Sequence, residues 1–258
     1  MEETLTQNSA HPFFKLKNIL DELREKCPWD KVQTWQTLRP LTLEEVFELN
    51  DSLLAEDAPA VCEELGDILL HILFYAKIAA EQQQFTIENV LTNLCNKLIS
   101  RHPHIYGTVQ VANEAEVKQN WEQLKLKEGK KSVLAGVPDG MPSVLKAWRI
   151  QEKAAAIGFD WPNANGALEK IHEELSEIQV AINEQKTEHL EAEVGDLLFA
   201  AINYARLLNI NPDTALEKTN KKFKQRFQWM ETQSLEQGKT LKELTLSEME
   251  ELWQESKH

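Results

Sequence analysis

Four acidic residues with a fixed spacing occur twice in this sequence, and this repetition limits what the chain can fold into. In each copy the four residues form two pairs, and the two members of a pair are three positions apart. The first copy consists of Glu45, Glu48, Glu64 and Asp67, and the second consists of Glu174, Glu177, Glu193 and Asp196. From Glu45 to Glu174 the separation is 129 residues, and it is the same at all four positions. Residues three positions apart lie on one face of an α-helix, so each copy predicts two helices that each present a pair of carboxylates.

The order of the pairs predicts that the two helices of each copy form an antiparallel hairpin. Residues that face each other across a hairpin share a midpoint in the sequence, which is residue 56 in the first copy and residue 185 in the second. Polar segments that favour a turn, 55–59 and 184–188, lie at these midpoints. We therefore expect a helix, a tight turn and a returning helix in each copy, with four carboxylates that meet between the helices.

The first hairpin helix is expected to begin at Thr42, after a connector that covers residues 33–40. Glu45 stands three residues after Thr42, which is also the position of the glutamate in a capping box. The second copy has no Ser or Thr at the equivalent position, so the repeat favours a metal-binding role over a capping role. Gly66 and Gly195 lie at equivalent positions inside the returning helices, where we expect a close approach by a neighbouring helix or by an ion and its ligand.

Four converging carboxylates need a cation between them. In a medium with an effective dielectric constant of about 20, each close pair costs on the order of 4 kcal/mol. A set of oxygen ligands without His or Cys suits a hard ion such as Mg²⁺, which keeps positions open for water and for phosphate oxygens. The alternative is two solvated acidic helix faces, which is the usual explanation of a single acidic pair. Repetition of the whole pattern favours a metal site.

The composition and the period predict an all-α protein with two domains. The chain has 258 residues with only nine Gly and nine Pro, and 27% of its residues are charged. Apolar residues recur at helical spacing, which argues against disorder and against an all-β fold. We expect an N-terminal domain over 12–107, a helical connector and linker over 108–142, and a C-terminal domain over 143–258, each domain built on one acidic hairpin.

The net charge and the cysteines narrow the partners and the compartment. A formal charge of −14 repels phosphate backbones, so a broad nucleic-acid-binding face is not expected. Three scattered cysteines, Cys27, Cys62 and Cys95, suggest a reducing compartment. With no signal peptide and no apolar run of membrane length, we expect a cytoplasmic protein without membrane contact.

Basic residues follow each acidic hairpin in a third predicted helix. Lys97 and Arg101 are four positions apart in the first half, and Lys222 and Arg226 have the same spacing in the second. Such pairs lie on one helix face and could meet a phosphate chain, although an exposed basic stripe is the alternative. Trp253, near the C-terminus, is either a packing residue or a base-stacking residue.

Several short strings resemble the MazG family, within the all-α NTP pyrophosphatase superfamily. The strings are Cys27-Pro28-Trp29-Asp30, Gln33-Thr34, Leu43-Glu44-Glu45, Glu63-Glu64-Leu65-Gly66-Asp67, Arg101-His102-Pro103-His104 and Gly158-Phe159-Asp160-Trp161. They and the two acidic sets cover nearly the whole chain. The resemblance implies a homodimer of tandem MazG-type helical domains. It implies Mg²⁺-dependent hydrolysis of nucleoside triphosphates, ATP among them, between the α and β phosphates, with broad base specificity.

The resemblance also implies roles for individual residues. It makes the C-terminal domain catalytic and the N-terminal domain structural or weakly active. Metal binding and catalysis fall to Glu174, Glu177, Glu193 and Asp196, with Glu45, Glu48, Glu64 and Asp67 as a second metal set. Nucleotide contacts fall to Lys170, Glu173, Lys222, Arg226 and Trp253.

The sequence leaves two other functions open. One is a narrower enzyme that removes dUTP or a modified nucleotide, because the superfamily uses the same acidic scaffold for several bases. The other is a helical module that binds Mg-nucleotide without turnover and signals to a regulatory protein partner. A panel of substrates distinguishes the first, and nucleotide binding without product would indicate the second.

Overall fold

The computed structural model describes residues 11–113, 116–117, 120–121, 132–185 and 187–257, and within these residues it contains helices and no β-strand. The predicted all-α class is confirmed. The chain divides into two compact units, Met1–Gln110 and Val111–His258. Among the described helices, none combines the length and the apolar character that a membrane span needs. Within the expected helical connector and linker over 108–142, residues 114–115, 118–119 and 122–131 lie outside the described residues.

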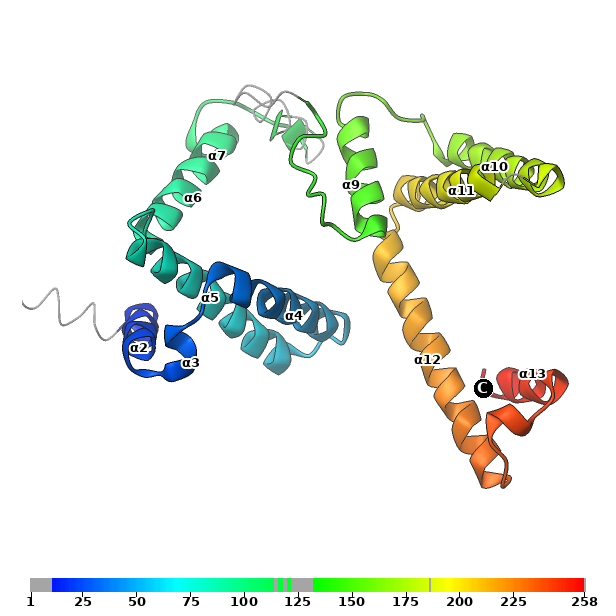
Figure 1. Ribbon diagram of the computed structural model, residues 1–258. Coiled ribbons are helices and arrows are strands. Elements are labelled where there is room, and N and C mark those ends of the chain that lie inside the picture. The colour runs from blue at the N-terminus through cyan, green and yellow to red at the C-terminus, as the bar shows by residue number, and fades with distance from the viewer. Residues whose placement is uncertain (1–10, 114–115, 118–119, 122–131, 186, 258) are drawn as a thin grey trace, which may run out of the picture. The chain divides into compact units, whose positions relative to one another are not determined.

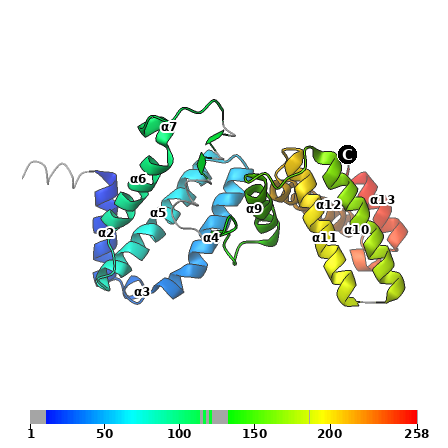
Figure 2. The ribbon, with the colours of Figure 1, turned by 90° about the horizontal axis from the view of Figure 1, so that it is seen from above.

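Unit 1 is built on a hairpin of two long helices, α4 (Trp35–Leu54) and α5 (Ala58–Glu81) (Figures 1 and 2). Among the described residues, α2 (Pro12–Lys26) and α3 (Pro28–Lys31) precede this hairpin, and α6 (Ile87–Arg101) and α7 (Pro103–Tyr106) follow it. The buried core side chains come from α2, α4, α5 and α6; they are Leu20, Leu38, Leu73, Phe74, Ala76, Ile78 and Ile87. The core therefore fixes the hairpin from one side and leaves its acidic face free.

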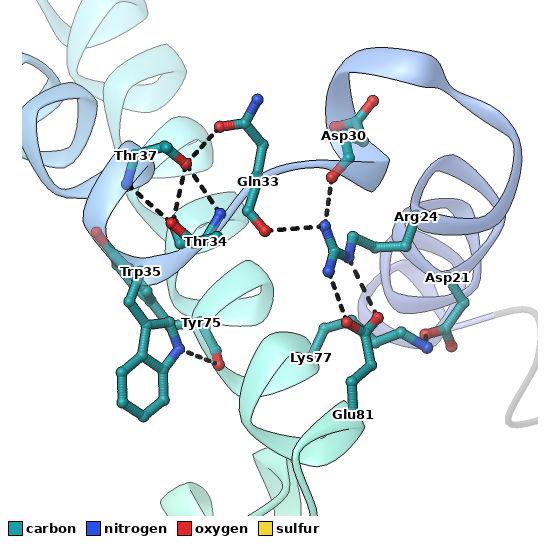
Figure 3. A network of polar contacts seen from close by, with 10 residues as sticks. All are labelled: Asp21, Arg24, Asp30, Gln33, Thr34, Trp35, Thr37, Tyr75, Lys77 and Glu81. Carbon is teal, nitrogen blue, oxygen red and sulfur yellow. Dashed lines mark hydrogen bonds and ion pairs between the residues drawn. The ribbon is translucent and has the colours of Figure 1, made fainter.

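Polar contacts fix the N-terminal helices of unit 1 to the C-terminal half of α5 (Figure 3). Arg24 on α2 donates to the backbone carbonyls of Asp30 and Gln33, and its Nε and Nη2 donate to the two carboxylate oxygens of Glu81 at 3.2 and 2.6 Å. On the neighbouring turn, Lys77 pairs with Asp21 at 2.7 Å. These contacts hold α2, α3 and the start of α4 in place, so they support the hairpin without taking part in its acidic face.

Unit 2 repeats the hairpin with α10 (Ala164–Glu184) and α11 (Thr187–Leu207). Before it lies α9 (Ser143–Ala155), whose Gln151 donates to the carbonyl of Phe199 on α11 at 2.8 Å. After it come α12 (Pro212–Glu236), a short 3₁₀ turn (Leu241–Glu243) and α13 (Leu246–Glu255). A small core of Met230, Leu244 and Leu252 packs α13 on α12. In Figure 1, α13 lies beside the C-terminal part of α12.

Both turns have the geometry that the sequence predicted. Glu56 and Gln185, the two predicted midpoints, have φ values of 56° and 55°. A single residue in the left-handed region reverses the chain direction between two helices, and polar side chains tolerate this conformation better than branched ones. In unit 1, the Asp57 side chain then accepts from the Ala60 amide and starts the returning helix. The hairpin prediction is confirmed in both units.

The predicted start of the first hairpin helix is wrong. The helix begins at Trp35, and residues 33–40 are not a connector. The reason is a reciprocal cap: the Thr34 hydroxyl accepts from the Thr37 amide, and the Thr37 hydroxyl accepts from the Thr34 amide. Thr42 lies inside the helix, where its hydroxyl donates to the Leu38 carbonyl. Glu45 therefore has no capping role.

Candidate metal and nucleotide site

Three carboxylates of the second acidic set converge between the helices of the unit 2 hairpin. Glu174 and Glu177 project from α10 and Glu193 from α11, and one oxygen of each lies within 4.8 Å of the others. Glu174 is buried, with 2% of its surface exposed, whereas Glu177 is exposed. The i and i+3 spacing on α10 and the return of α11 after the turn produce this arrangement, as the sequence predicted.

Asp196, the fourth predicted ligand, is not a member of this group. It lies three residues after Glu193 on α11, so it stands on the same helix face, and it is exposed. The structure therefore brings together three of the four carboxylates, with the fourth on the adjacent turn.

Lys170 supplies a positive charge at the edge of the unit 2 cluster. Its Nζ lies 2.5 Å from Oε1 of Glu174 and 2.8 Å from Oε1 of Glu173. The hydrogen bond from Lys170 holds the pKa of Glu174 below its ordinary value. The pKa of Glu177 is raised, first by its hydrogen bond with Glu174 and then by loss of hydration and the neighbouring negative charges. One lysine therefore leaves the cluster with excess negative charge.

Glu174, a member of this cluster, retains an unsatisfied carboxylate oxygen. Its Oε2 is buried and has no hydrogen-bond partner in the part of the chain that the structure describes. A buried carboxylate oxygen without a partner is costly, and a cation bound there would satisfy it. Together with two further carboxylates, it forms an all-oxygen donor set, which fits a hard divalent ion such as Mg²⁺.

Unit 1 gathers the equivalent carboxylates in a different environment. Glu45 and Glu48 on α4 and Glu64 on α5 also place one oxygen each within 4.8 Å of the others. Partial burial raises the pKa of Glu45, and the negative charges of Asp67, Glu48 and Glu44 raise it further. Leu41 occupies the position equivalent to Lys170. Among the residues with described side chains, no lysine or arginine forms an ion pair with these three glutamates.

A polar network lies beside the unit 1 cluster. The Thr42 hydroxyl lies 2.8 Å from Nδ1 of His71 and 2.6 Å from the Tyr75 hydroxyl. Burial lowers the pKa of His71, and the charge of Asp67 opposes this effect. At the equivalent positions, unit 2 has Ile171, Ala200 and Tyr204, so it lacks the histidine and the threonine.

The predicted nucleotide contacts fall into two groups in unit 2. Lys170 and Glu173 lie at the carboxylate cluster. Arg226 and Trp253 lie together, with the guanidinium carbon 5.6 Å from the centre of the indole ring. Lys222 is exposed on α12, four residues before Arg226. In the described part of unit 2, no hydrogen bond or ion pair joins Arg226 to the carboxylate cluster.

The structure adds two features to these groups that were not predicted from the sequence. Phe223 packs against Trp253 with ring centroids 5.1 Å apart, and it stacks on Phe227 at 6.0 Å. The i and i+4 spacing of the two phenylalanines, next to Lys222, was the signal that could have identified this aromatic group. The contact between Lys170 and Glu174 could likewise have been found from their separation of four residues.

The glycines of the returning helices do not make the close approach that was expected from a neighbouring helix. A Cβ atom added at Gly66 or at Gly195 would meet nothing within 4 Å. Within the described chain no neighbouring helix comes this close, and approach by an ion and its ligand stays a prediction. The exposed side chains of Leu198 and Phe199 follow Gly195 on the same face of α11.

Comparison with known proteins finds one family and several relatives. The profile of the MazG nucleotide pyrophosphohydrolase domain matches residues 33–106 and 164–230, which include both hairpins. A protein of Escherichia coli strain K12 named nucleoside triphosphate pyrophosphohydrolase is 37% identical over 255 residues, covering 94% of this chain and 96% of that protein.

Two further relatives extend this result. A Thermotoga maritima protein named nucleoside triphosphate pyrophosphohydrolase/pyrophosphatase MazG is 40% identical over 250 residues, with 95% of each chain covered. The uncharacterized protein YabN of Bacillus subtilis is 41% identical over 96% of this chain, which corresponds to 52% of YabN. The similarity therefore extends over both units.

Proposed function

Because this chain belongs to the family of MazG nucleotide pyrophosphohydrolase domains, we propose that it hydrolyses nucleoside triphosphates between the α and β phosphates with Mg²⁺. The products are the nucleoside monophosphate and pyrophosphate. The observation that carries this proposal is the unit 2 cluster, in which three carboxylates converge and a buried oxygen of Glu174 has no partner. The names of the Escherichia coli and Thermotoga maritima relatives support the substrate class.

The proposed metal ligands are Glu174, Glu177 and Glu193, with Asp196 from the adjacent turn of α11. When bound there, a divalent ion supplies positive charge to the phosphate oxygens and activates water for attack on phosphorus. The four side chains hold this charge at one place between the helices. Glu174 fixes the position, because its burial leaves its carboxylate little freedom to move.

Basic and aromatic side chains of unit 2 bind the rest of the substrate. Lys222 and Arg226, one helical turn apart, neutralise the charge that develops on the departing pyrophosphate. Phe223, which is 55% exposed, lies beside Trp253, and a base can stack on the exposed part of this aromatic pair; such stacking tolerates different bases. We therefore expect broad base specificity, with the MazG-type domain over 143–258, within unit 2, as the catalytic domain and the domain over 12–107, within unit 1, as a structural or weakly active one.

We further propose a homodimer that acts in the cytoplasm. On α11, the apolar side chains of Val194, Leu198 and Phe199 are 42, 60 and 42% exposed, and Gly195 beside them has open space. Exposed apolar side chains that share a helix face mark a surface that another protein copy can cover. Sedimentation equilibrium of the wild type and of Leu198→Lys tests this, and a wild type that is monomeric at micromolar concentration contradicts it.

The test of the activity is pyrophosphate release from a panel of canonical and modified nucleoside triphosphates, with Mg²⁺ and with EDTA. We expect turnover of several bases with Mg²⁺ only. Asp196→Asn should lower the rate by on the order of 10²–10³-fold, because it removes one negative charge from the proposed metal site. The matched control is Asp67→Asn at the equivalent position of unit 1.

The outcomes separate the alternatives. A near-native rate for Asp196→Asn contradicts the assignment of this residue, and a larger loss for Asp67→Asn places the activity in unit 1. Turnover of dUTP or a modified nucleotide alone identifies the narrower enzyme. Tight binding of nucleotide without product identifies a binding module.

A further inference from the structure

The contact between Lys170 and Glu174 occupies one oxygen of a proposed metal ligand. Nζ of Lys170 is 2.5 Å from Oε1 of Glu174, while Oε2 of the same carboxylate has no partner among the described residues. Of the three carboxylates in the unit 2 cluster, Glu174 alone is buried. A buried carboxylate with no cation nearby is strongly disfavoured, so the lysine stabilises this carboxylate when no ion is bound.

The contact between Lys170 and Glu174 also opposes the binding of a divalent ion at this carboxylate. An ammonium group and a divalent cation on one carboxylate repel each other over a few ångströms, and the repulsion is strongest beside a buried group. Both cations also draw on the negative charge of the same carboxylate, because Mg²⁺ and Mn²⁺ bind carboxylate oxygens directly. Binding of the ion and retention of the lysine contact therefore disfavour each other.

Lys170 has an alternative partner within reach. The carboxylate of Glu173 lies 2.8 Å from the same Nζ, and its side chain is 57% exposed. The Lys170 side chain is itself 37% exposed, so it is not enclosed beside Glu174. After leaving, it remains beside the cluster, paired with Glu173 or with an anionic group of the substrate.

Unit 1 shows that a converging carboxylate cluster does not require such a lysine. Leu41 stands at the equivalent position, and one oxygen each of Glu45, Glu48 and Glu64 still lies within 4.8 Å of the others, as in unit 2. The lysine is therefore a feature of the proposed catalytic unit rather than of the hairpin.

We propose that Lys170 is a built-in counter-ion that occupies Glu174 in the metal-free enzyme and must give up this contact when the divalent ion binds, keeping its contact with Glu173 or pairing with the substrate. This inference rests on the proposed function, because it takes the unit 2 cluster as the metal site. If Lys170 acts in this way, the affinity of unit 2 for the metal depends on displacement of Lys170 from Glu174. A triphosphate that attracts Lys170 therefore strengthens metal binding, and the metal strengthens nucleotide binding by the same factor.

The test is a titration with Mn²⁺ alone, followed by the electron paramagnetic resonance signal of the free ion. All full-length chains carry Glu45→Gln and Glu48→Gln, so that the titration reports on unit 2. In this parent, Lys170→Met should lower the Mn²⁺ dissociation constant by about 3- to 10-fold, since one competing positive charge is removed. The matched control is Lys239→Met, which removes a lysine that pairs with Glu248 elsewhere in unit 2 and should leave the constant unchanged.

A second measurement is thermal unfolding. In EDTA, Lys170→Met should melt several degrees below the parent, because the buried Glu174 loses its counter-ion. Saturating Mn²⁺ should raise its melting temperature by more than it raises that of the parent. If Lys170→Met does not fold, Lys170→Gln keeps a hydrogen-bond donor for Glu174 without the charge, and its Mn²⁺ affinity should change in the same direction.

Two results distinguish the inference from the proposed function. If the parent binds Mn²⁺ and the Lys170→Met variant binds it equally or more weakly, the proposed displacement of Lys170 by the metal is overturned. Lys170 would then orient Glu174 for the metal instead of competing with it. A parent that binds no Mn²⁺ overturns the proposed metal site and this inference with it.

Discussion

The hairpins of the two units have nearly the same helices but different surroundings for the same carboxylates. α4 and α10 begin at Trp35 and Ala164, and α5 and α11 begin at Ala58 and Thr187. Both starting positions differ by the 129 residues that separate the acidic sets. The helices therefore hold each set of carboxylates in one arrangement, and the residues one turn away decide what each set can do.

The difference concerns burial and counter-charge. In unit 2, Glu174 is 2% exposed and paired with Lys170, whereas Glu45 in unit 1 is only half-buried and has Leu41 at the equivalent of that lysine. As a result the pKa of Glu174 is lowered and the pKa of Glu45 is raised. An acidic motif therefore identifies the scaffold, whereas the neighbouring side chains distinguish the two sites.

The largest expected difference is in catalysis. Glu174→Gln should lower the rate of pyrophosphate release by on the order of 10³-fold, because it removes the buried ligand that fixes the proposed metal site. Glu45→Gln, the matched change in unit 1, should lower it by less than about threefold. Initial rates at saturating Mg²⁺ measure both variants. Equal losses would show that the two clusters act together and would end the division of roles between the units.

The next difference concerns the ion pairs that hold the returning helices. Arg206 in unit 2 binds Asp160 through two contacts of 2.5 and 3.0 Å, whereas Lys77 at the equivalent position in unit 1 makes one contact with Asp21. Because two-point charged hydrogen bonds are stronger, Arg206→Met should lower the free energy of unfolding of unit 2 by about 1–3 kcal/mol.

Lys77→Met, the matched change in unit 1, should cost at most about 1 kcal/mol. Chemical denaturation followed by peptide-resolved hydrogen exchange reports each unit separately. A cost for Lys77→Met as large as that for Arg206→Met would mean that the two-point geometry contributes nothing beyond a single ion pair.

A smaller difference is expected from the tyrosines at equivalent positions of α5 and α11. The Tyr75 hydroxyl lies 2.6 Å from the Thr42 hydroxyl, so Tyr75→Phe should destabilise unit 1 by about 1 kcal/mol. The Tyr204 hydroxyl forms no hydrogen bond with another described residue, and Tyr204→Phe should change the stability of unit 2 by less than about 0.5 kcal/mol. The same exchange experiment compares them, and a larger effect in unit 2 would contradict the assignment of the network to unit 1.

The smallest expected effect concerns how the stability of the metal-free protein depends on pH. The contributions of Glu45 and Glu174 to this dependence have opposite signs. The pKa of Glu45 lies above its ordinary value of 4.5, so its contribution to stability is present below pH 4.5 and is lost as the pH rises through the raised pKa. Glu45→Gln should therefore raise the melting temperature at pH 7 in EDTA by about 1–3 °C and have little effect near pH 4.

Glu174 behaves in the opposite way. Its pKa is lowered, first by the hydrogen bond from Lys170, so its contribution is present above pH 4.5 and is lost as the pH falls through the lowered pKa. Glu174→Gln should lower the melting temperature at pH 7 in EDTA. Differential scanning calorimetry at both pH values measures these shifts, and shifts of the same sign in the two variants would contradict the contrast between the clusters.

The helices, the hairpins and the positions of their turns follow from the sequence alone. These features depend on local geometry: residues three apart share a helix face, and the matched midpoints place Glu56 and Gln185 at the reversals, where both adopt positive φ. The prediction failed at the start of α4, because the reciprocal cap of Thr34 and Thr37 competes with the expected start at Thr42, and spacing alone does not rank two caps.

Which charges meet, and which of them are buried, depends on how the helices pack. Packing buried Glu174 alone among the three carboxylates of the unit 2 cluster and left Asp196 exposed on the next turn. It also left open space beside Gly66 and Gly195, where a neighbouring helix was expected. Spacing could not predict these features, because helical periodicity is a property of the backbone, whereas burial and pairing depend on side chains that other helices bring near.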